Sequence, residues 1–352
     1  MQQKIITDEK LLLHLSLNRI TFLKYSEKKF LAKKLDSSYS LALLSIEEIE
    51  KIIRRNFNKR VVWDGKENLR MAERAFRYCQ SHKIKILLND EEQYPDMLRQ
   101  ISDPPYLLFC RGDYSILGNN SVSVVGTRRL SPGGKQAAKS FAYQAVLDAC
   151  NVVSGLAHGA DGFAHQGAID AFYDCNESNG DCSKLGKTIA VLPSGIDEII
   201  PYSHKKMAEQ ILVSGGCIIS EYEPGMQMAN WHFVGRNRII AGLSPATLVI
   251  EAPDGSGALI TADFALEYNR ELMFHKAGFN VQSKAIAEIV KRELKADYMA
   301  GKVSDYKMQN TVNRFLDSGA LVIEDYKDYC KALRECPGER NIQPEQGLLF
   351  EL

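Results

Sequence analysis

The sequence predicts an α/β fold with a doubly wound, mostly parallel sheet, preceded by a small all-helical domain. Two observations support this prediction. From residue 121 to residue 273, short apolar runs alternate with amphipathic stretches, and glycine-rich turns separate them. That alternation is typical of parallel strands with helices on both faces of the sheet. From residue 9 to residue 88, by contrast, apolar residues recur at helical spacing.

Length and composition bound the class of protein. The chain has 352 residues, of which 45% are hydrophobic and 25% charged, which suits a soluble protein of about two domains. No run of about 18 apolar residues occurs, so no membrane span is expected. The first residues do not resemble a signal peptide, and the 8 cysteines form no CxxC pair. A cytoplasmic protein with reduced thiols and no zinc site is expected.

Positive charge is concentrated near the N-terminus. Residues 1–90 hold 19 Lys and Arg against 11 Asp and Glu, although the whole chain has a net charge of 0. A basic segment is the electrostatic signature of a nucleic acid or another acidic partner. Solubility alone explains the same charge equally well, so both interpretations stay open.

The all-helical domain is expected over residues 1–88. Ser45, followed three residues later by Glu48, is typical of a helix-capping box. The domain is either a SAM-like or helix-hairpin-helix-like module that holds phosphates, or a module that only packs against its neighbour. Helices are predicted at 9–17, 28–34, 45–57 and 68–82.

A linker and lead-in strand are expected over residues 89–115. A short strand at 85–88 precedes them. A second strand at 106–109 follows a breaker cluster that contains Pro104 and Pro105. The chain therefore enters the sheet domain through a rigid approach.

Residues 116–278 are expected to form the sheet domain. Within it, residues 173–182 are acidic, polar and aperiodic, which predicts a surface loop. Strands are predicted at 121–126, 151–154, 188–192, 217–220 and 246–252, and helices at 134–147, 159–173 and 203–212, with another beginning near Trp231.

A helical extension over residues 279–336 is expected to complete this domain. Residues 337–352 are rich in Pro, Gly, Glu and Gln, so a flexible tail is expected there, although residues 348–352 are apolar enough to dock. Helices are predicted at 285–296, 308–316 and 326–334, and a strand at 320–323.

The first candidate site is the turn that follows the strand at 121–126. Gly126 lets the chain turn, Thr127 offers a hydroxyl, and Arg128 is placed to clamp a phosphate at the next helix N-terminus. The alternative is that Arg128 only fastens the loop through an ion pair. The spacing is not GxGxxG, so a nicotinamide or flavin cofactor is not expected.

A second turn follows the next strand and contains Ser154, Gly155 and Gly159, where the glycines allow close approach by a ligand. Asp161 and His165 lie four residues apart on the following helix, which predicts that they bond to each other. No third ligand accompanies them, so a structural use is favoured over catalysis or metal binding.

The third and fourth candidate groups add cations, an aromatic ring and another helix N-terminus. Each has a structural alternative: the lysine is solvated, the aromatic packs its loop, and the arginines brace the pocket through ion pairs with acids such as Glu221 or Glu251. No P-loop or GxSxG motif occurs, so no catalytic residue is assigned. The residues are His204, Lys205, Phe233, Arg236, Asn237, Arg238, Gly255 and Ser256.

These groups, in this order, resemble the DNA-processing protein A (DprA/Smf) family. The string Arg-Asn-Arg-Ile-Ile-Ala-Gly-Leu-Ser, which begins at Arg236, is long and uncommon. The resemblance also includes the small helical domain. The other matching residues are 126–128, 154–155, 159–161, 194–197, 220–221, Phe233 and 257–261, with Tyr94, Pro95 and 103–105.

The resemblance implies an extended Rossmann-like domain that binds single-stranded DNA and works as a homodimer. Members of the family are recombination mediators that load RecA onto incoming DNA during natural transformation, with no established catalytic step. The implied partners are single-stranded DNA, the RecA recombinase and a second copy of the chain, with no cofactor. Arg128 is the closest match to the family's phosphate-gripping arginine.

The sequence departs from the family pattern at several places. His204 stands where an asparagine is usual, and a Val-Gly pair before Arg236 replaces a proline and a basic residue. Residues 274–278 differ from the usual ending, the loop at 173–182 is extra, and residues 279–318 are longer than the usual linker. The C-terminus does not resemble the winged-helix module of many relatives. These differences bear on DNA affinity and on the dimer surface.

Two other functions are compatible with parts of the sequence. A nucleotide-processing enzyme of the phosphoribohydrolase-like Rossmann group uses similar glycine-rich phosphate loops, but the loop at 254–261 lacks the catalytic acid at the right offset. Release of free base from AMP would support that function. A protein-interaction scaffold would use the basic N-terminal helices against an acidic partner, and a gel shift with single-stranded DNA distinguishes the two binding roles.

Overall fold

A nine-stranded sheet organises residues 2–335, the part of the chain that this computed structural model describes. In chain order its strands are β1 (Lys85–Leu88), β2 (Leu107–Gly112), β3 (Ser121–Val125), β4 (Asn151–Ser154), β5 (Thr188–Val191), β6 (Cys217–Ser220), β7 (Ala246–Val249), β8 (Glu271–His275) and β9 (Leu321–Ile323). Their order in space is β1-β2-β6-β5-β4-β3-β7-β8-β9.

Most neighbouring strands of this sheet are parallel. Antiparallel pairing is confined to β1 with β2 and β2 with β6, whereas the pairs from β6 through to β9 are parallel. The chain runs outward from β3 through β4 and β5 to β6, and then returns to the other side of β3 as β7. The predicted mostly parallel α/β fold is confirmed, and β3 is the strand at which the order reverses.

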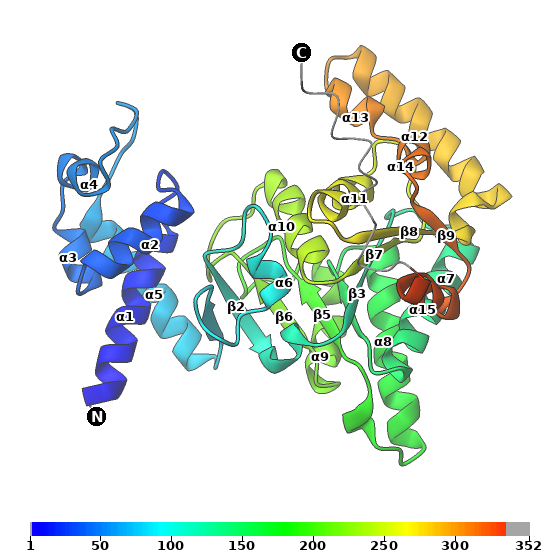
Figure 1. Ribbon diagram of the computed structural model, residues 1–352, viewed down its shortest axis with the longest axis horizontal. Helices are drawn as coiled ribbons and strands as arrows, with labels where there is room; N and C mark the ends of the chain where they lie inside the picture. Colours follow the sequence, from blue (N-terminus) through cyan, green and yellow to red (C-terminus); the bar gives the residue numbers. More distant parts are fainter. Residues whose placement is uncertain (1, 336–352) are drawn as a thin grey trace, which may run out of the picture.

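Helices cover both faces of the sheet (Figure 1). Alternate residues of β3 enter opposite cores: Val124 packs with α7 and α8, and Val125 packs with α10 and α11. The helices are α1 (Gln2–Asn18), α2 (Tyr25–Lys34), α3 (Ser38–Ala42), α4 (Ile46–Ile53), α5 (Gly65–Ser81), α6 (Asp96–Arg99), α7 (Pro132–Leu147), α8 (Ala160–Glu177), α9 (Lys205–Val213), α10 (Asn230–Gly242), α11 (Gly257–Glu267), α12 (Val281–Met299), α13 (Asp305–Gln309), α14 (Val312–Asp317) and α15 (Tyr326–Glu335).

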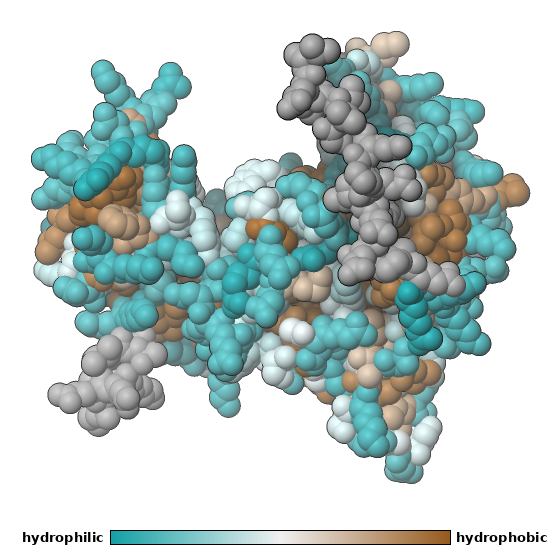
Figure 2. Space-filling view, viewed as in Figure 1, coloured by the Kyte–Doolittle hydropathy of each residue, from teal (hydrophilic) through white to brown (hydrophobic). Residues whose placement is uncertain are grey.

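Helices α1 to α5 form a lobe beside the antiparallel edge of the sheet, blue in Figure 1. Figure 2 shows a notch between this lobe and the rest of the molecule at the top of the view. Away from the notch the lobes share one core, in which Leu17 and Leu31 pack in the same cluster as Phe109 and Ile218 of the sheet. The helical lobe therefore covers apolar surface that the sheet would otherwise expose.

Local capping fixes the start of one helix in this lobe as the sequence predicts. The backbone N–H of Glu48 donates to Ser45 Oγ at 3.2 Å, and the backbone N–H of Ser45 donates to Glu48 Oε2 at 2.8 Å. The predicted capping box at the N-terminus of α4 is therefore confirmed.

Several predicted boundaries are wrong. The strand predicted at 246–252 ends at Val249, and α8 continues to Glu177, so the first half of the predicted loop at 173–182 is helical. The helix predicted at 308–316 is interrupted at Asn310 and Thr311, where Thr311 caps α14. Helices α3 and α6 and strand β8 were not predicted.

The C-terminal part of the described chain extends the sheet. Strand β9 pairs in parallel with β8, and α15 packs against α7. Between β8 and β9 in sequence, α12 to α14 form the orange group at the upper right of Figure 1. The flexible tail expected at 337–352, including the apolar residues 348–352, lies outside the described residues. Within residues 2–335 we find no helix both long and apolar enough to cross a membrane.

Candidate nucleic-acid interface

A cavity of about 360 Å³ opens at the carboxyl end of β3, where the strand order reverses. Ligands of doubly wound sheets bind at such switch points. Side chains from the loop after β3, from α10, from the N-terminus of α11 and from α12 line it together. The polar and aromatic lining residues are Thr127, Arg128, Arg129, Asp161, Phe233, Arg236, Asn237, Ser256, Thr261 and Glu293.

Arg128 is an exposed cation at the mouth of this cavity. Its guanidinium carbon lies 5.3 Å from the centre of the Phe233 ring. Among the described residues no carboxylate lies within 4.0 Å of it, so the alternative in which Arg128 only fastens its loop through an ion pair has no support. A guanidinium free of carboxylates can bind a phosphate, and an adjacent aromatic ring can stack on a base.

Backbone contacts hold the Arg128 loop in place. The N–H of Thr127 donates to Glu251 O at 2.7 Å, and the N–H of Arg129 donates to Thr127 Oγ1 at 3.1 Å. Gly159 has a φ of 82°, and a Cβ there would lie 2.2 Å from Thr127 O. Gly159 therefore packs closely against this loop and does not line the cavity, and its contact with a ligand stays a prediction.

The N-terminus of α11 also faces the cavity. Ser256, Gly257 and Ala258 line it, and Ser256 Oγ is buried without a hydrogen-bond partner in the described structure. Free N–H groups and the helix dipole make a helix N-terminus favourable for an anion. Neighbouring Gly255 does not line the cavity, because it packs against Leu294 and the backbone of Lys307. Its contact with a ligand stays a prediction.

Arg236 lies beneath the cavity and is 5% exposed. Its Nη1 donates to Val191 O at 2.7 Å, and its Nη2 lies 3.5 Å from Asp161 Oδ2. Burial raises the pKa of Asp161, and Arg236 opposes that shift. A Cβ at Gly155 would lie 1.7 Å from Arg236 Nη1. Arg236 is thus a paired structural cation, and the close approach predicted at Gly155 is made by Arg236, not by a ligand.

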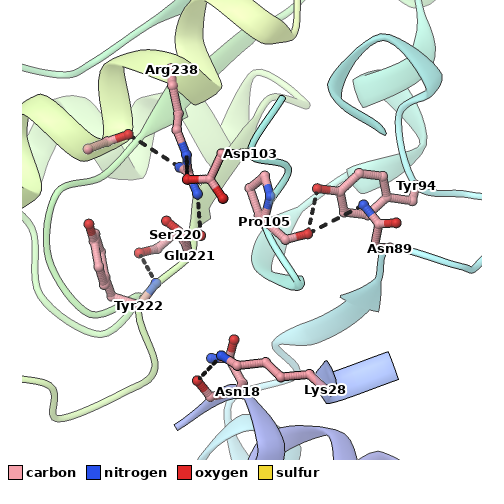
Figure 3. Close-up of polar contacts among 11 residues, drawn as sticks. Asn18, Lys28, Asn89, Tyr94, Asp103, Pro105, Ser220, Glu221, Tyr222 and Arg238 are labelled. Carbon is pink, nitrogen blue, oxygen red and sulfur yellow. Dashed lines mark hydrogen bonds and ion pairs between the residues drawn. The ribbon is translucent and has the colours of Figure 1, made fainter. Parts of the chain in front are cut away.

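Arg238 does not line the cavity and points towards Asp103 and Glu221 (Figure 3). It bonds to Glu221 Oε1 at 2.5 Å and to Asp103 Oδ2 at 3.2 Å, so it ties α10 to the lead-in segment before β2. Burial lowers the pKa of Arg238, but Glu221 and Asp103 more than offset this and raise it. The predicted ion pair between Arg238 and Glu221 is confirmed, whereas contact of Arg238 with DNA stays a prediction.

Glu251 has a different role from the one predicted. Its carboxylate accepts from Ser131 N at 2.9 Å and from Ser131 Oγ at 2.5 Å, and it does not pair with an arginine. Ser131 in turn caps α7 by accepting from the N–H of Gly134 at 3.0 Å. Glu251 therefore fixes the start of α7 relative to the loop that carries Arg128.

Two further predicted contacts lie elsewhere. Ser154 is fully buried, and its Oγ donates to Val124 O at 2.6 Å, so it joins two strands and does not line the cavity. Asn237 does line it, and its side chain accepts from Arg236 Nε at 3.1 Å.

His204 and Lys205 lie outside this cavity. His204 Nδ1 is 2.9 Å from Leu156 O, and its ring centre is 4.7 Å from that of His158. Lys205 is exposed, with Nζ 4.0 Å from the ring centre of Tyr202. Contact of these two residues with a ligand stays a prediction.

Asp161 and His165 do not bond to each other, contrary to the sequence prediction. His165 Nδ1 lies 2.7 Å from Thr188 Oγ1 in the core, and burial lowers the pKa of His165 to about 3. Both residues are buried, in keeping with the structural use that the sequence favoured. No group of three or more metal-ligating side chains occurs in the described chain.

Several lining residues were not among the predicted site residues, including Arg129, Val290 and Glu293. Arg129 was adjacent to a predicted residue but not assigned, whereas Val290 and Glu293 come from α12. Nothing in the local pattern of α12 distinguishes these two from its other exposed residues. Their role depends on where α12 docks.

Comparison with known proteins agrees with this fold. Protein Smf of Borreliella burgdorferi is 30% identical over 265 residues, which cover 75% of this chain and 79% of that protein. The chain spans about half the length of several other curated relatives that it matches.

Two relatives of known structure have the same fold. DNA processing protein A (DprA) from Streptococcus pneumoniae has a TM-score of 0.62 at 25% identity, covering 90% of this chain and 95% of that one. DNA processing protein A from Helicobacter pylori, studied for its single-stranded DNA binding mode, has a TM-score of 0.53 at 24% identity, covering 72% and 96%.

The sequence match to a protein family includes all of the sheet and the cavity described above. It runs from residue 85 to residue 334 and is to the family described as DNA recombination-mediator protein A. Because this match covers most of the chain, the protein belongs to the DNA recombination-mediator protein A (DprA/Smf) family.

Proposed function

We propose that this chain is a recombination mediator that binds single-stranded DNA in the cavity at the end of β3. The observation that carries the proposal is Arg128, an exposed guanidinium without a carboxylate partner in the described structure, over the ring of Phe233. Its neighbour is the N-terminus of α11 with the unpartnered hydroxyl of Ser256. A cation, an aromatic face and a helix N-terminus are the groups that hold a phosphate and stack a base.

In the proposed binding mode, the protein contacts the phosphates of the DNA strand and does not distinguish between bases. Arg128 exchanges its contact with Phe233 for a phosphate, the ring stacks on the adjacent base, and Ser256 donates to a phosphate oxygen. Stacking tolerates every base, and phosphate contacts release counterions. Affinity is therefore expected to fall steeply with salt and to depend little on sequence.

Two further roles, dimer formation and recombinase loading, are supported by family membership. We infer that the chain acts as a homodimer and loads a RecA-type recombinase onto strands taken up during transformation. Light scattering of the purified protein measures the first. Displacement of single-strand-binding protein by RecA, with and without this chain, measures the second.

Replacing Arg128 tests the site directly. Arg128→Ala is expected to weaken binding to a dT oligonucleotide about threefold or more and to flatten the salt dependence by about 0.7 in log–log slope, because one phosphate contact is lost. Fluorescence anisotropy at two salt concentrations measures both quantities.

Arg334→Ala is the matched control, since it removes another exposed arginine, from α15 on the other face of the sheet. It is expected to bind like the wild type. Wild-type affinity and slope in Arg128→Ala would show that the strand binds elsewhere.

A further inference from the structure

Helix α12 forms one wall of the cavity, although it belongs to the stretch that is longer than the usual family linker. Val290 and Glu293 line the cavity from this helix. Both carboxylate oxygens of Glu293 accept from Arg129 Nη1, at 3.1 and 3.0 Å. An acidic side chain therefore occupies the rim of a site that otherwise attracts anions.

Specific contacts hold the helix in this position. Leu294, the next residue, is buried, and Gly255 packs against its side chain. Lys291 Nζ lies 3.5 Å from Asp254 Oδ2, and the N–H of Gly255 donates to Asn310 O at 2.8 Å. The loop that opens α11 and the extension thus fasten each other, which places Glu293 beside Arg129.

The charges that line the cavity are largely cancelled by these contacts. Three arginines and two carboxylates line it. Arg236 pairs with Asp161 at 6% and 8% side-chain exposure, whereas Arg129 pairs with Glu293 at 61% and 53%. The buried pair is fixed, while the exposed pair is screened by water and exchanges readily. Arg128 is left as the lining cation without a carboxylate partner.

We infer that Glu293 sets the affinity of this site by competing with a strand phosphate for Arg129. Arg129 is adjacent to Arg128, and a guanidinium that binds a carboxylate through its N–H groups binds a phosphate in the same way. A strand that enters the cavity must therefore displace Glu293 before Arg129 contributes a second phosphate contact. This inference rests on the proposed function of the cavity.

The test is a double-mutant cycle with a dT oligonucleotide as the probe. Glu293→Gln is expected to raise affinity at low salt about three- to tenfold and to steepen the salt dependence by about 0.7 in log–log slope, because one more phosphate is contacted. In an Arg129→Gln background the same Glu293→Gln change is expected to produce no gain, because the freed cation is absent.

Glu288→Gln is the matched control. It removes the same charge from the same helix, at an exposed position that does not line the cavity, and it is expected to leave affinity unchanged. Equal gains in affinity from Glu293→Gln and Glu288→Gln would mean that the gain comes from the overall charge of the protein. That result would overturn the inference. A gain that persists in the Arg129→Gln background would also overturn it.

The two proposals fail in distinguishable ways. Loss of binding in Arg128→Ala, together with no change in Glu293→Gln, refutes the role of Glu293 and leaves the site standing. Wild-type affinity in Arg128→Ala would refute both the proposed site and the role of Glu293. Thermal unfolding of each variant shows that it is folded before its affinity is compared.

Discussion

Three arginines near the cavity differ in what surrounds their guanidinium groups. Arg128 is exposed and lies over a ring, Arg236 contacts a buried carboxylate and a backbone carbonyl, and Arg238 contacts two carboxylates. A cation whose donors are already used inside the protein has few left for a ligand, and removal of Arg236 would leave the buried Asp161 unpaired. Of the three, Arg128 therefore fits the proposed binding role best, whereas the other two arginines hold neighbouring elements together.

The buried imidazole of His165 makes stability depend on pH. Its pKa is lowered from 6.5 to about 3 by burial, with His204 and Arg236 acting in the same direction. Between these values the unfolded chain binds a proton that the folded chain does not. The contribution to stability is fully present above pH 6.5 and is lost as the pH falls towards 3.

His165→Asn is expected to reduce this dependence. The wild type should lose about 2 kcal/mol more than the variant between pH 7.5 and pH 5, because only the wild type has this titrating ring. Urea unfolding at both pH values measures the difference. Other histidines are unchanged in the variant, so an equal loss in the two proteins would show that His165 is protonated in the folded state.

At the scale of single elements, the spacing of apolar residues in the sequence predicts most of the strands and helices. Each strand from β3 to β7 was expected because a short apolar run ends at a turn former. The strand β8 was missed because it begins with Glu271 and ends with His275, which hide its buried centre. The break between α13 and α14 was missed because the apolar spacing continues across it.

The candidate site was predictable only where it depends on one loop. Gly126, Thr127 and Arg128 are contiguous, so the turn after β3 identifies them. The packing of distant elements decides that Arg236 and Arg238 are buried and that Glu293 lies at the cavity. The sequence shows that these residues are charged but does not show which residues they pair with. The glycine pattern at Gly155 was interpreted as room for a ligand, whereas the structure fills that room with an arginine.

The cap of α7 joins this helix to the cavity loop, and its removal gives a prediction at the element scale. Ser131→Ala is expected to cost about 2–3 kcal/mol, because it removes a cap worth about 1 kcal/mol and leaves the buried Glu251 with one donor fewer. Ser45→Ala is the comparison, since Ser45 caps α4 at an exposed position and is expected to cost only about 1 kcal/mol. Urea unfolding measures both, and equal costs would show that the Glu251 contact contributes nothing.

Across the whole molecule, the helical lobe and the sheet are joined by shared apolar packing and by polar contacts. Arg19 of the loop after α1 pairs with Glu223 beyond β6. Lys28 lies in the same junction (Figure 3), where burial lowers its pKa to about 8 while Glu221 and Asp103 act in the opposite direction. Neither lobe retains a complete core without the other, because the apolar face at β2 and β6 is closed by α1 and its neighbours.

This shared core predicts a single cooperative unfolding transition. The chain contains 2 tryptophans, and they report on different lobes. Trp63 packs against the shared core and donates to Leu44 O at 2.8 Å, whereas Trp231 lies near the cavity against His232. In Trp231→Phe the fluorescence follows the helical lobe, and in Trp63→Phe it follows the sheet.

Within each variant, the urea midpoint by fluorescence is expected to coincide with the midpoint by circular dichroism, because partial unfolding would expose the core of the remaining lobe to water. A fluorescence midpoint in Trp231→Phe well below its circular dichroism midpoint would mean that the helical lobe unfolds first, and that the sheet keeps its apolar edge closed by other means.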